Sequence, residues 1–140
     1  PCFPRDNVAL NFMGAQLGVD SRLLKTNDDY NRGLSKRYVE KLQPHLPKGA
    51  NVCVLGLAYK PLSHVIEESP GVYLCRALSE AGYRVVGHDN LAAPHAEQAL
   101  KMSALVTDSL DAALKDADVV LVTTTDKAYT SLTAENLLRG

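Results

Sequence analysis

Residues 51–61 read NVCVLGLAYKP, and this stretch decides the fold. The part from 51 to 58 is short and almost continuously apolar, which is typical of a strand buried inside a parallel sheet. Gly56 lies near its end, where the absence of a side chain lets the backbone turn tightly. We therefore predict a central strand here, followed by a loop at its carboxyl end.

From this strand to the end of the chain, the sequence patterns predict alternating helices and strands. A helix capped by Ser69, with Pro70 in its first turn, is predicted to end at Gly82. The later segments are predicted as strand 83–89, helix 93–102, strand 104–107, helix 109–117, strand 118–125 and a last helix from 133. This rhythm predicts an α/β fold, a Rossmann-like parallel sheet with flanking helices.

A helical arm is predicted in front of the sheet. Residues 7–18 carry an apolar stripe with Asp6 as the N-cap, so that Cys2 would stand before the first helix. A longer helix follows and is predicted to stop at Pro44, with a break near Gly33, where the helix propensity is weak.

The clearest linker is QPHLPKGAN at 43–51, with two prolines and a glycine in nine residues. It divides the chain into a helical segment, 1–46, and an α/β domain, 47–140. A chain of 140 residues with 46% hydrophobic content supports one core of useful size, whereas two compact domains would be crowded. Because the first residue is Pro1, we expect a piece of a longer polypeptide.

The charge and the cysteine pattern exclude several functional classes. A formal net charge of −1 argues against nucleic acid and anionic membrane surfaces as partners, since both are bound by clustered positive charge. No apolar run approaches the length of about 18 residues that spans a bilayer. Three widely spaced cysteines and four scattered histidines predict neither a disulfide framework nor a metal site, and the expected compartment is cytoplasmic.

Several residues are predicted to have structural roles. Cys53 and Cys75 fall on apolar faces and are expected in the core. Asp89 follows the second strand, where Rossmann folds place a ribose-binding carboxylate, but the turn after the first strand lacks the G-x-G-x-x-G pattern. We therefore interpret Asp89 as a turn residue and expect no NAD site of the usual kind on this sheet. His88 and His64 are expected to face solvent.

Two residues could carry chemistry. Lys60 follows the first strand, at the edge where open α/β sheets bind ligands. Its ammonium group could contact a phosphate or a sugar, or it could be an ordinary surface lysine in water. Cys2 could be a nucleophile, because Arg5 supplies a positive charge nearby and Asp6 a possible base. It could equally be a loop cysteine without a function. The residues by themselves leave both alternatives open.

Ordered motifs along the chain resemble the nucleotide-sugar dehydrogenase family, the UDP-glucose and GDP-mannose dehydrogenases. PCFPRD at 1–6 is similar to the cysteine motif of that family, and LLKTNDDYNRG at 23–33 to its central helix. LGLAYKP at 55–61, followed by ESPGVYLCRALSEAGYRVVGHDN at 68–90, resembles the start of its C-terminal nucleotide-sugar-binding domain. DADVVLVTTTDKAY at 116–129 resembles a later strand and turn of that domain.

The resemblance implies an enzyme that oxidises the C6 alcohol of a nucleotide sugar to a carboxylate with two NAD⁺, as in UDP-glucose to UDP-glucuronate. Cys2 would be the nucleophile, forming a thiohemiacetal and then a thioester, and Asp6 would activate water or the thiol. Arg5, where lysine is usual, would keep a positive charge near the cofactor or the thiolate. Tyr59 and Lys60 match a pair that contacts the nucleotide sugar.

The resemblance also implies what the chain lacks and where it differs. The NAD-binding domain and the last strand of the C-terminal domain would lie outside it, so the fragment is expected to be inactive alone. The central helix, from Leu23 to Leu42, would form a homodimer. His64 and Val65 replace a pair that is commonly acidic, and Glu67 replaces an arginine. The alternatives are a GDP-mannose dehydrogenase and a non-catalytic Rossmann-like binding or assembly module.

Overall fold

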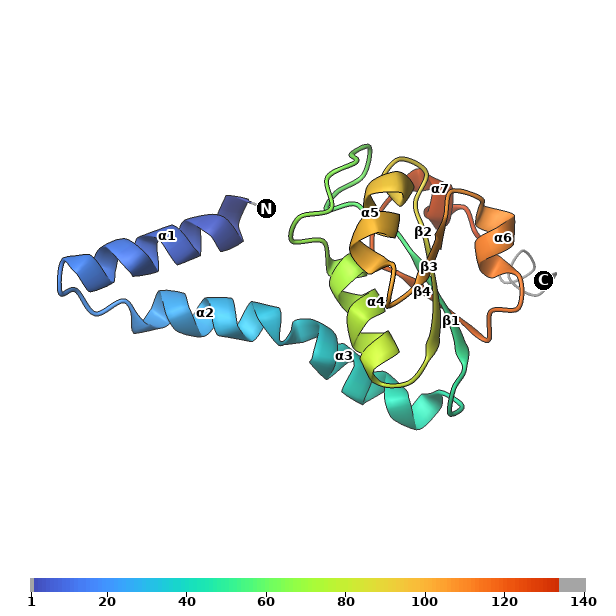
Figure 1. Cartoon of the computed structure of the whole chain (residues 1–140), viewed down its shortest axis with the longest axis horizontal. Coiled ribbons are helices and arrows are strands. Elements are labelled where there is room, and N and C mark those ends of the chain that lie inside the picture. The colour runs from blue at the N-terminus through green and yellow to red at the C-terminus, as the bar shows by residue number, and fades with distance from the viewer. Residues whose placement is uncertain (1, 134–140) are drawn as a thin grey trace.

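The computed structural model describes residues 2–133 and shows a helical arm attached to an α/β domain (Figure 1). The arm consists of α1 (Cys2–Gln16), α2 (Arg22–Arg32) and α3 (Leu34–Leu42), followed by a 3-10 turn, η1 (Gln43–His45). Helix α1 folds back along α2, so that its N-terminal end returns toward the domain (Figure 1).

Four parallel strands form the described sheet, in the order β3-β2-β1-β4. Strand β1 (Asn51–Leu55) pairs with β2 (Arg84–His88) and with β4 (Val119–Val122), and β3 (Leu105–Thr107) pairs with β2. The helices of the domain are α4 (Pro70–Glu80), α5 (Ala93–Leu100), α6 (Leu110–Leu114) and α7 (Lys127–Thr130). The predicted α/β fold with an all-parallel sheet is confirmed.

The side chains of β1 alternate between the two faces of the sheet, which explains why this strand is apolar throughout. Val52 and Val54 belong to a cluster with residues of α3, α4 and α5. Cys53 and Leu55 belong to a second cluster with residues of α6 and α7. All four are at most 1% exposed, so both faces of the strand are sealed from water. Cys75 is also fully buried, and the prediction of two core cysteines is confirmed.

Helix α4 begins where predicted and packs on the turn after β1. The Ser69 hydroxyl accepts a hydrogen bond from the Val72 amide at 3.4 Å, and Pro70 takes the first helical position, where its missing N–H is not needed. Gly71 lies against the carbonyl oxygen of Gly56, so close that a Cβ atom at Gly71 would collide with it. The helix can approach the turn this closely only because residue 71 lacks a side chain.

The arm differs from the prediction at its start. Helix α1 begins at Cys2, so Cys2 does not precede the first helix, and Asp6 lies inside the helix and is not its N-cap. Pro4 is tolerated there because the N–H groups of a first helical turn have no intrahelical acceptor. The expected break near Gly33 is confirmed, since this residue separates α2 from α3.

The structure adds two short elements that the sequence patterns did not reveal, the 3-10 turn η1 and helix α7. Helix α7 spans a single turn after Asp126, whose carboxylate accepts a hydrogen bond from the Ala128 amide at 2.9 Å. One turn is too short for hydrophobic periodicity to mark it. The helix predicted from residue 133 onward falls on 134–140, outside the described residues.

Large apolar side chains are exposed mainly on the arm. No residue of α1 or α2 is buried, whereas α4 alone buries six. The exposed set on the arm comprises Phe3, Val8, Leu10, Phe12, Met13, Leu17, Val19, Leu23, Tyr30 and Tyr38.

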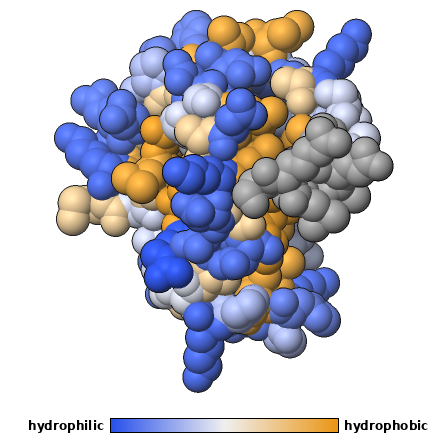
Figure 2. All heavy atoms as spheres, turned by 90° about the vertical axis from the view of Figure 1, so that its right-hand side faces the viewer, coloured by the Kyte–Doolittle hydropathy of each residue, from blue (hydrophilic) through white to orange (hydrophobic). Residues whose placement is uncertain are grey.

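At the opposite end of the molecule, hydrophobic atoms form a band between hydrophilic side chains (Figure 2). Within residues 2–133, no helix has both the length and the apolar character needed to cross a membrane.

Candidate functional site

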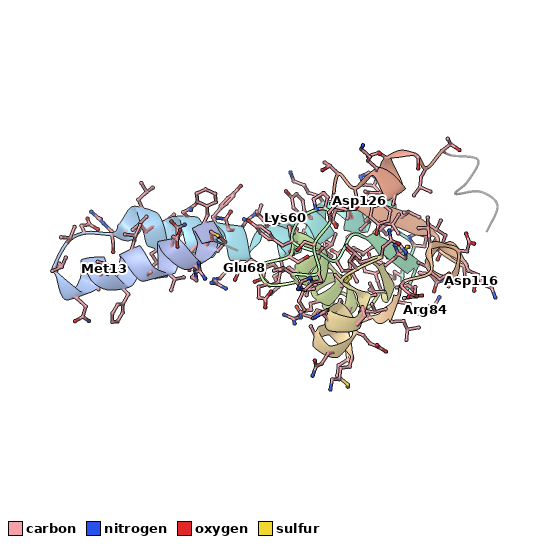
Figure 3. The ribbon with its side chains drawn as sticks, turned by 90° about the horizontal axis from the view of Figure 1, so that it is seen from above. Met13, Lys60, Glu68, Arg84, Asp116 and Asp126 are labelled. Atoms are coloured by element: carbon pink, nitrogen blue, oxygen red, sulfur yellow. The ribbon has the colours of Figure 1, made fainter. Side chains whose placement is uncertain are left out.

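The loops that follow β1 and β4 form the candidate site. These strands are neighbours in the sheet although they are far apart in sequence, and the crevice at the carboxyl ends of such strands is the usual ligand position. One open hollow there is lined by residues 59–61 and 122–125. A second hollow, of about 240 Å³, is lined by Lys60, Asp89 and Asp126 among others. Lys60 and Asp126 lie in the same part of the domain in Figure 3.

Lys60 borders both hollows and its side chain is exposed. Among the described residues it has no hydrogen-bond or ion-pair partner, so its ammonium group is available to an anion. The Tyr59 amide donates a hydrogen bond to the Val65 carbonyl at 2.7 Å, which folds the loop back on itself. Leu62 and Glu68 both have φ of 57°, a left-handed conformation that is uncommon outside glycine. The loop that presents Lys60 is thus bent at two strained positions.

Asp89 is buried, and the backbone occupies both oxygens of its carboxylate. One oxygen accepts hydrogen bonds from the amides of Leu57 and Ala58, both at 2.9 Å. The other accepts from the amides of Leu91 and Ala92, at 2.9 and 2.8 Å. Asp89 therefore ties the turn after β1 to the start of α5, and its prediction as a turn residue is confirmed.

The described sheet does not fit a dinucleotide in the usual way. A loop of residues 57–69 separates the turn at Gly56 from α4, in place of a glycine-rich turn that leads straight into a helix. Asp89, which stands where a ribose-binding acid would lie, is already saturated by backbone N–H groups. The described residues of this sheet therefore lack the usual dinucleotide cradle of a glycine-rich turn and a free ribose-binding acid.

His88 is buried, which corrects the prediction that it faces solvent. Its Nε2 lies 3.2 Å from the carbonyl oxygen of Asp108, and its Nδ1 lies 2.9 Å from the Tyr129 hydroxyl. Because a carbonyl oxygen only accepts, Nε2 carries the proton and the Tyr129 hydroxyl donates to Nδ1. Burial lowers the pKa of His88 below its usual value, an effect that the Asp108 carbonyl partly opposes. The pair holds α7 against the end of β2.

Thr123 is a residue of the site that the sequence analysis did not single out. Its hydroxyl lies 2.5 Å from the carbonyl oxygen of Gly56 and 3.1 Å from that of Leu55. Its amide also donates to the Leu55 carbonyl, at 3.0 Å. Thr123 thereby holds the end of β4 against the turn after β1 and fixes one wall of the crevice. The run of threonines after β4 was its only signal in the sequence.

The predicted cysteine, arginine and acid lie together on the arm. Cys2, Arg5 and Asp6 are exposed on the first turns of α1. Their neighbours Phe3, Pro4 and Asn7 line a cavity of about 810 Å³ between the arm, α4 and β4, and the three predicted residues do not. Within residues 2–133, no side-chain hydrogen bond or ion pair joins these three residues to another residue, Tyr59 and Lys60 included. The structure therefore keeps the cysteine, arginine and acid on the arm and the Tyr59–Lys60 pair on the domain, without polar contact between the two groups.

Burial separates Cys2 from the other two cysteines. Cys53 and Cys75 are fully buried, and the loss of hydration raises the pKa of each thiol to about 12. Cys2 is exposed. Of the three thiols, all of them in the described part of the chain, only Cys2 is accessible to an electrophile.

Residues 53–139 match the family model of the UDP binding domain of the UDP-glucose/GDP-mannose dehydrogenase family. The chain belongs to this family. The matched residues include the whole crevice between β1 and β4, so the candidate site lies in the UDP-binding domain of a family member.

Other members of the UDP-glucose/GDP-mannose dehydrogenase family resemble nearly the whole chain. It is 34% identical to the UDP-glucose 6-dehydrogenase AglM of Haloferax volcanii, over 96% of the chain and 31% of that protein. The UDP-glucose dehydrogenase of Pyrobaculum islandicum has a similar structure, with a TM-score of 0.79 and 31% identity over 94% of the chain and 31% of that protein.

A GDP-mannose dehydrogenase of Pseudomonas aeruginosa has the same fold, with a TM-score of 0.73 and 21% identity over 92% of the chain and 31% of that protein. The chain thus spans about 30% of the length of these relatives.

We predict that His88 makes the protein less stable as the solution becomes acidic. Its pKa is lower in the folded protein than the ordinary value of 6.5, so the unfolded chain binds the proton more readily. The stability is therefore full above about pH 6.5 and falls as the pH drops through the folded-state pKa. Urea unfolding at pH 7.5 and 5.5 measures this loss.

The variant His88→Gln keeps polar groups at this position and cannot titrate, so it should lose less stability between the two pH values than the unmodified chain. His45→Gln, at an exposed histidine of η1, should leave the difference unchanged. An unaltered pH dependence in His88→Gln would contradict the prediction.

Proposed function

We propose that this chain is part of an NAD-dependent nucleotide-sugar 6-dehydrogenase, and that it contributes the nucleotide-sugar-binding domain and the cysteine segment. The reaction is the oxidation of the C6 alcohol of a UDP-sugar to a carboxylate, as in the formation of UDP-glucuronate from UDP-glucose. The observation that carries the proposal is the match of residues 53–139 to the UDP-binding domain, within which Lys60 stands at the crevice.

Tyr59 and Lys60 are the proposed substrate-binding residues. The Lys60 ammonium is exposed at the edge of the sheet and has no described partner, which suits a point charge that meets a diphosphate. Tyr59 is half-buried in the same loop, where a ring can contact the sugar or the base while its backbone stays fixed by Val65. Thr123 and Thr124 also line the hollow.

Cys2 is the proposed nucleophile. Its thiolate sulfur adds to the aldehyde carbon to form a C–S bond, and oxidation of this thiohemiacetal gives a thioester that water hydrolyses. Since α1 begins at Cys2, Asp6 follows four residues later and Arg5 three residues later, on the same face of the helix. This spacing supports Asp6 as the group that activates water or the thiol, and Arg5 as a positive charge near the cofactor.

NAD⁺ is the hydride acceptor that the proposal requires, and the described sheet does not fit it. We assign its site to the roughly 70% of a family member that these residues do not span. The chain by itself should therefore bind a nucleotide sugar and should not oxidise it.

We predict that Lys60→Ala weakens the binding of UDP-glucose to the chain, measured by isothermal titration calorimetry. Loss of one charge-assisted contact costs about 1.5–3 kcal/mol, which corresponds to roughly a tenfold to hundredfold weaker binding. Lys101→Ala removes an exposed lysine at the end of α5 and should leave the affinity unchanged. Tighter binding of GDP-mannose would indicate the other branch of the family, and tight binding of NAD⁺ would contradict our assignment of the sheet.

We predict that Cys2→Ala abolishes uronate formation in the complete protein that carries these residues. Without the thiol neither the thiohemiacetal nor the thioester can form. Product is measured by chromatography after incubation with UDP-glucose and NAD⁺. Gln16→Ala, at the other end of α1, serves as the control and should keep full activity. Uronate formation by Cys2→Ala at the normal rate would remove Cys2 from the mechanism.

We also propose that the arm forms a homodimer through the central helices, from Leu23 to Leu42. The support is physical: α2 buries none of its residues within the chain, and Leu23 on it is 80% exposed. A set of large exposed apolar side chains, such as the set on this arm, is characteristic of an interface. A partner chain would remove these side chains from water.

Sedimentation equilibrium should therefore show dimers, and Leu23→Glu should raise the dimer dissociation constant by at least about tenfold, because burying an unpaired carboxylate is costly. Gln98→Glu adds the same charge on the exposed side of α5 and should have no effect. A chain that stays monomeric at high concentration would contradict the proposed dimer.

A further inference from the structure

Two exposed histidines from different elements face each other beside the candidate site. His64 lies in the loop that carries Lys60, and His95 lies in the first turn of α5. Their ring centroids are 5.2 Å apart and the ring planes are tilted by 33°. Within residues 2–133 neither imidazole has a hydrogen-bond or ion-pair partner, so the ring nitrogens of both are available.

The distance between the rings suits two ligands of one metal ion. Two Zn–N bonds of about 2.1 Å at a tetrahedral angle place the centroids of the ligating imidazoles about 5.3 Å apart. Imidazole is also a favoured ligand of zinc, copper and nickel, whereas magnesium prefers oxygen. No group of three or more His, Cys, Asp or Glu side chains in the described part of the chain could hold a metal. Water would therefore fill the remaining coordination positions.

We propose that His64 and His95 form a two-histidine site for a divalent transition-metal ion of the zinc class. The proposal is independent of the dehydrogenase function, because it uses neither Lys60 nor the cysteine segment. The same centroid distance is compatible with simple ring stacking, which needs no metal. The experiment must therefore separate ligation from stacking.

A bound ion would attach the middle of the loop to α5. Asp89 already attaches the beginning of that loop to the start of the same helix, through the amides of Leu57 and Ala92 among others. The segment between these two attachments contains Lys60 and the strained Leu62. Metal binding would thus restrict the backbone that presents Lys60 to the crevice.

Isothermal titration of the chain with ZnCl₂ at pH 7.5 tests the proposal. The measurement uses the Cys2→Ser background, because the exposed Cys2 thiol is itself a zinc ligand. We expect one saturable site for Zn²⁺ and none for Mg²⁺. His64→Ala and His95→Ala should each weaken Zn²⁺ binding by at least about tenfold, the loss of one of two ligands. His45→Ala, an exposed histidine of η1, should bind as the background does.

The substitutions His64→Phe and His95→Phe separate the two explanations. Phenylalanine keeps a stacked ring and supplies no ligand nitrogen, so both variants should retain the folded circular dichroism spectrum and lose Zn²⁺ binding. Hydrogen exchange of residues 59–68 should become slower when Zn²⁺ is added to the background protein, and should not change in His64→Phe. Absence of saturable Zn²⁺ binding, or affinity within twofold of the background in the Phe variants, would overturn the proposal.

Discussion

The hydrogen bonds to the buried Asp89 carboxylate are the interactions on which the arrangement of the candidate site depends. It accepts four backbone hydrogen bonds, from Leu57 and Ala58 after β1 and from Leu91 and Ala92 before α5. Hydrogen bonds to a charged acceptor are stronger than neutral ones, and unpaired buried N–H groups are costly. One side chain thus supplies acceptors for two turns that have no ladder partners. The Tyr59–Lys60 segment follows directly after the first of these turns, so its position is set by Asp89.

The other walls of the crevice are held in the same manner, by polar contacts at strand ends. Thr123 joins β4 to the turn at Gly56, and Gly71 lets α4 pack directly on that turn. His88 and Tyr129 attach α7 to the end of β2, and α7 in turn carries Asp126 at its N-cap. The carboxyl ends of β1, β2 and β4 are therefore joined to one another and to α4 and α7 by these contacts, and the loop that presents Lys60 leaves the sheet beside them.

The arm differs from the domain in how much of its apolar surface is buried within the chain. Helices α1 and α2 bury none of their residues within the chain, yet carry large exposed apolar side chains, which are the surface that the proposed dimer would cover. The two helices α2 and α3 are joined across the break at Gly33 by Arg37, whose guanidinium stacks 4.0 Å over the Tyr30 ring and donates to the Tyr30 carbonyl. Arg37 thus links α2 and α3 across the break.

The sequence by itself determined the parallel α/β fold, the Ser69 cap, the break at Gly33, the core cysteines and the family, because periodicity, capping and ordered motifs are local signals. It could not place His88, since burial at a strand end depends on α7, a single turn without periodicity. It also misjudged where α1 starts, since Pro4 hides a first turn. Only the tertiary structure decided that backbone amides occupy both oxygens of Asp89, that Thr123 fixes one wall of the crevice and that the His64 and His95 rings lie side by side. The bonds of Asp89 to Leu57 and Ala58, of Thr123 to Leu55 and Gly56, and the contact of His64 with His95 all join residues far apart in sequence, which no local pattern encodes.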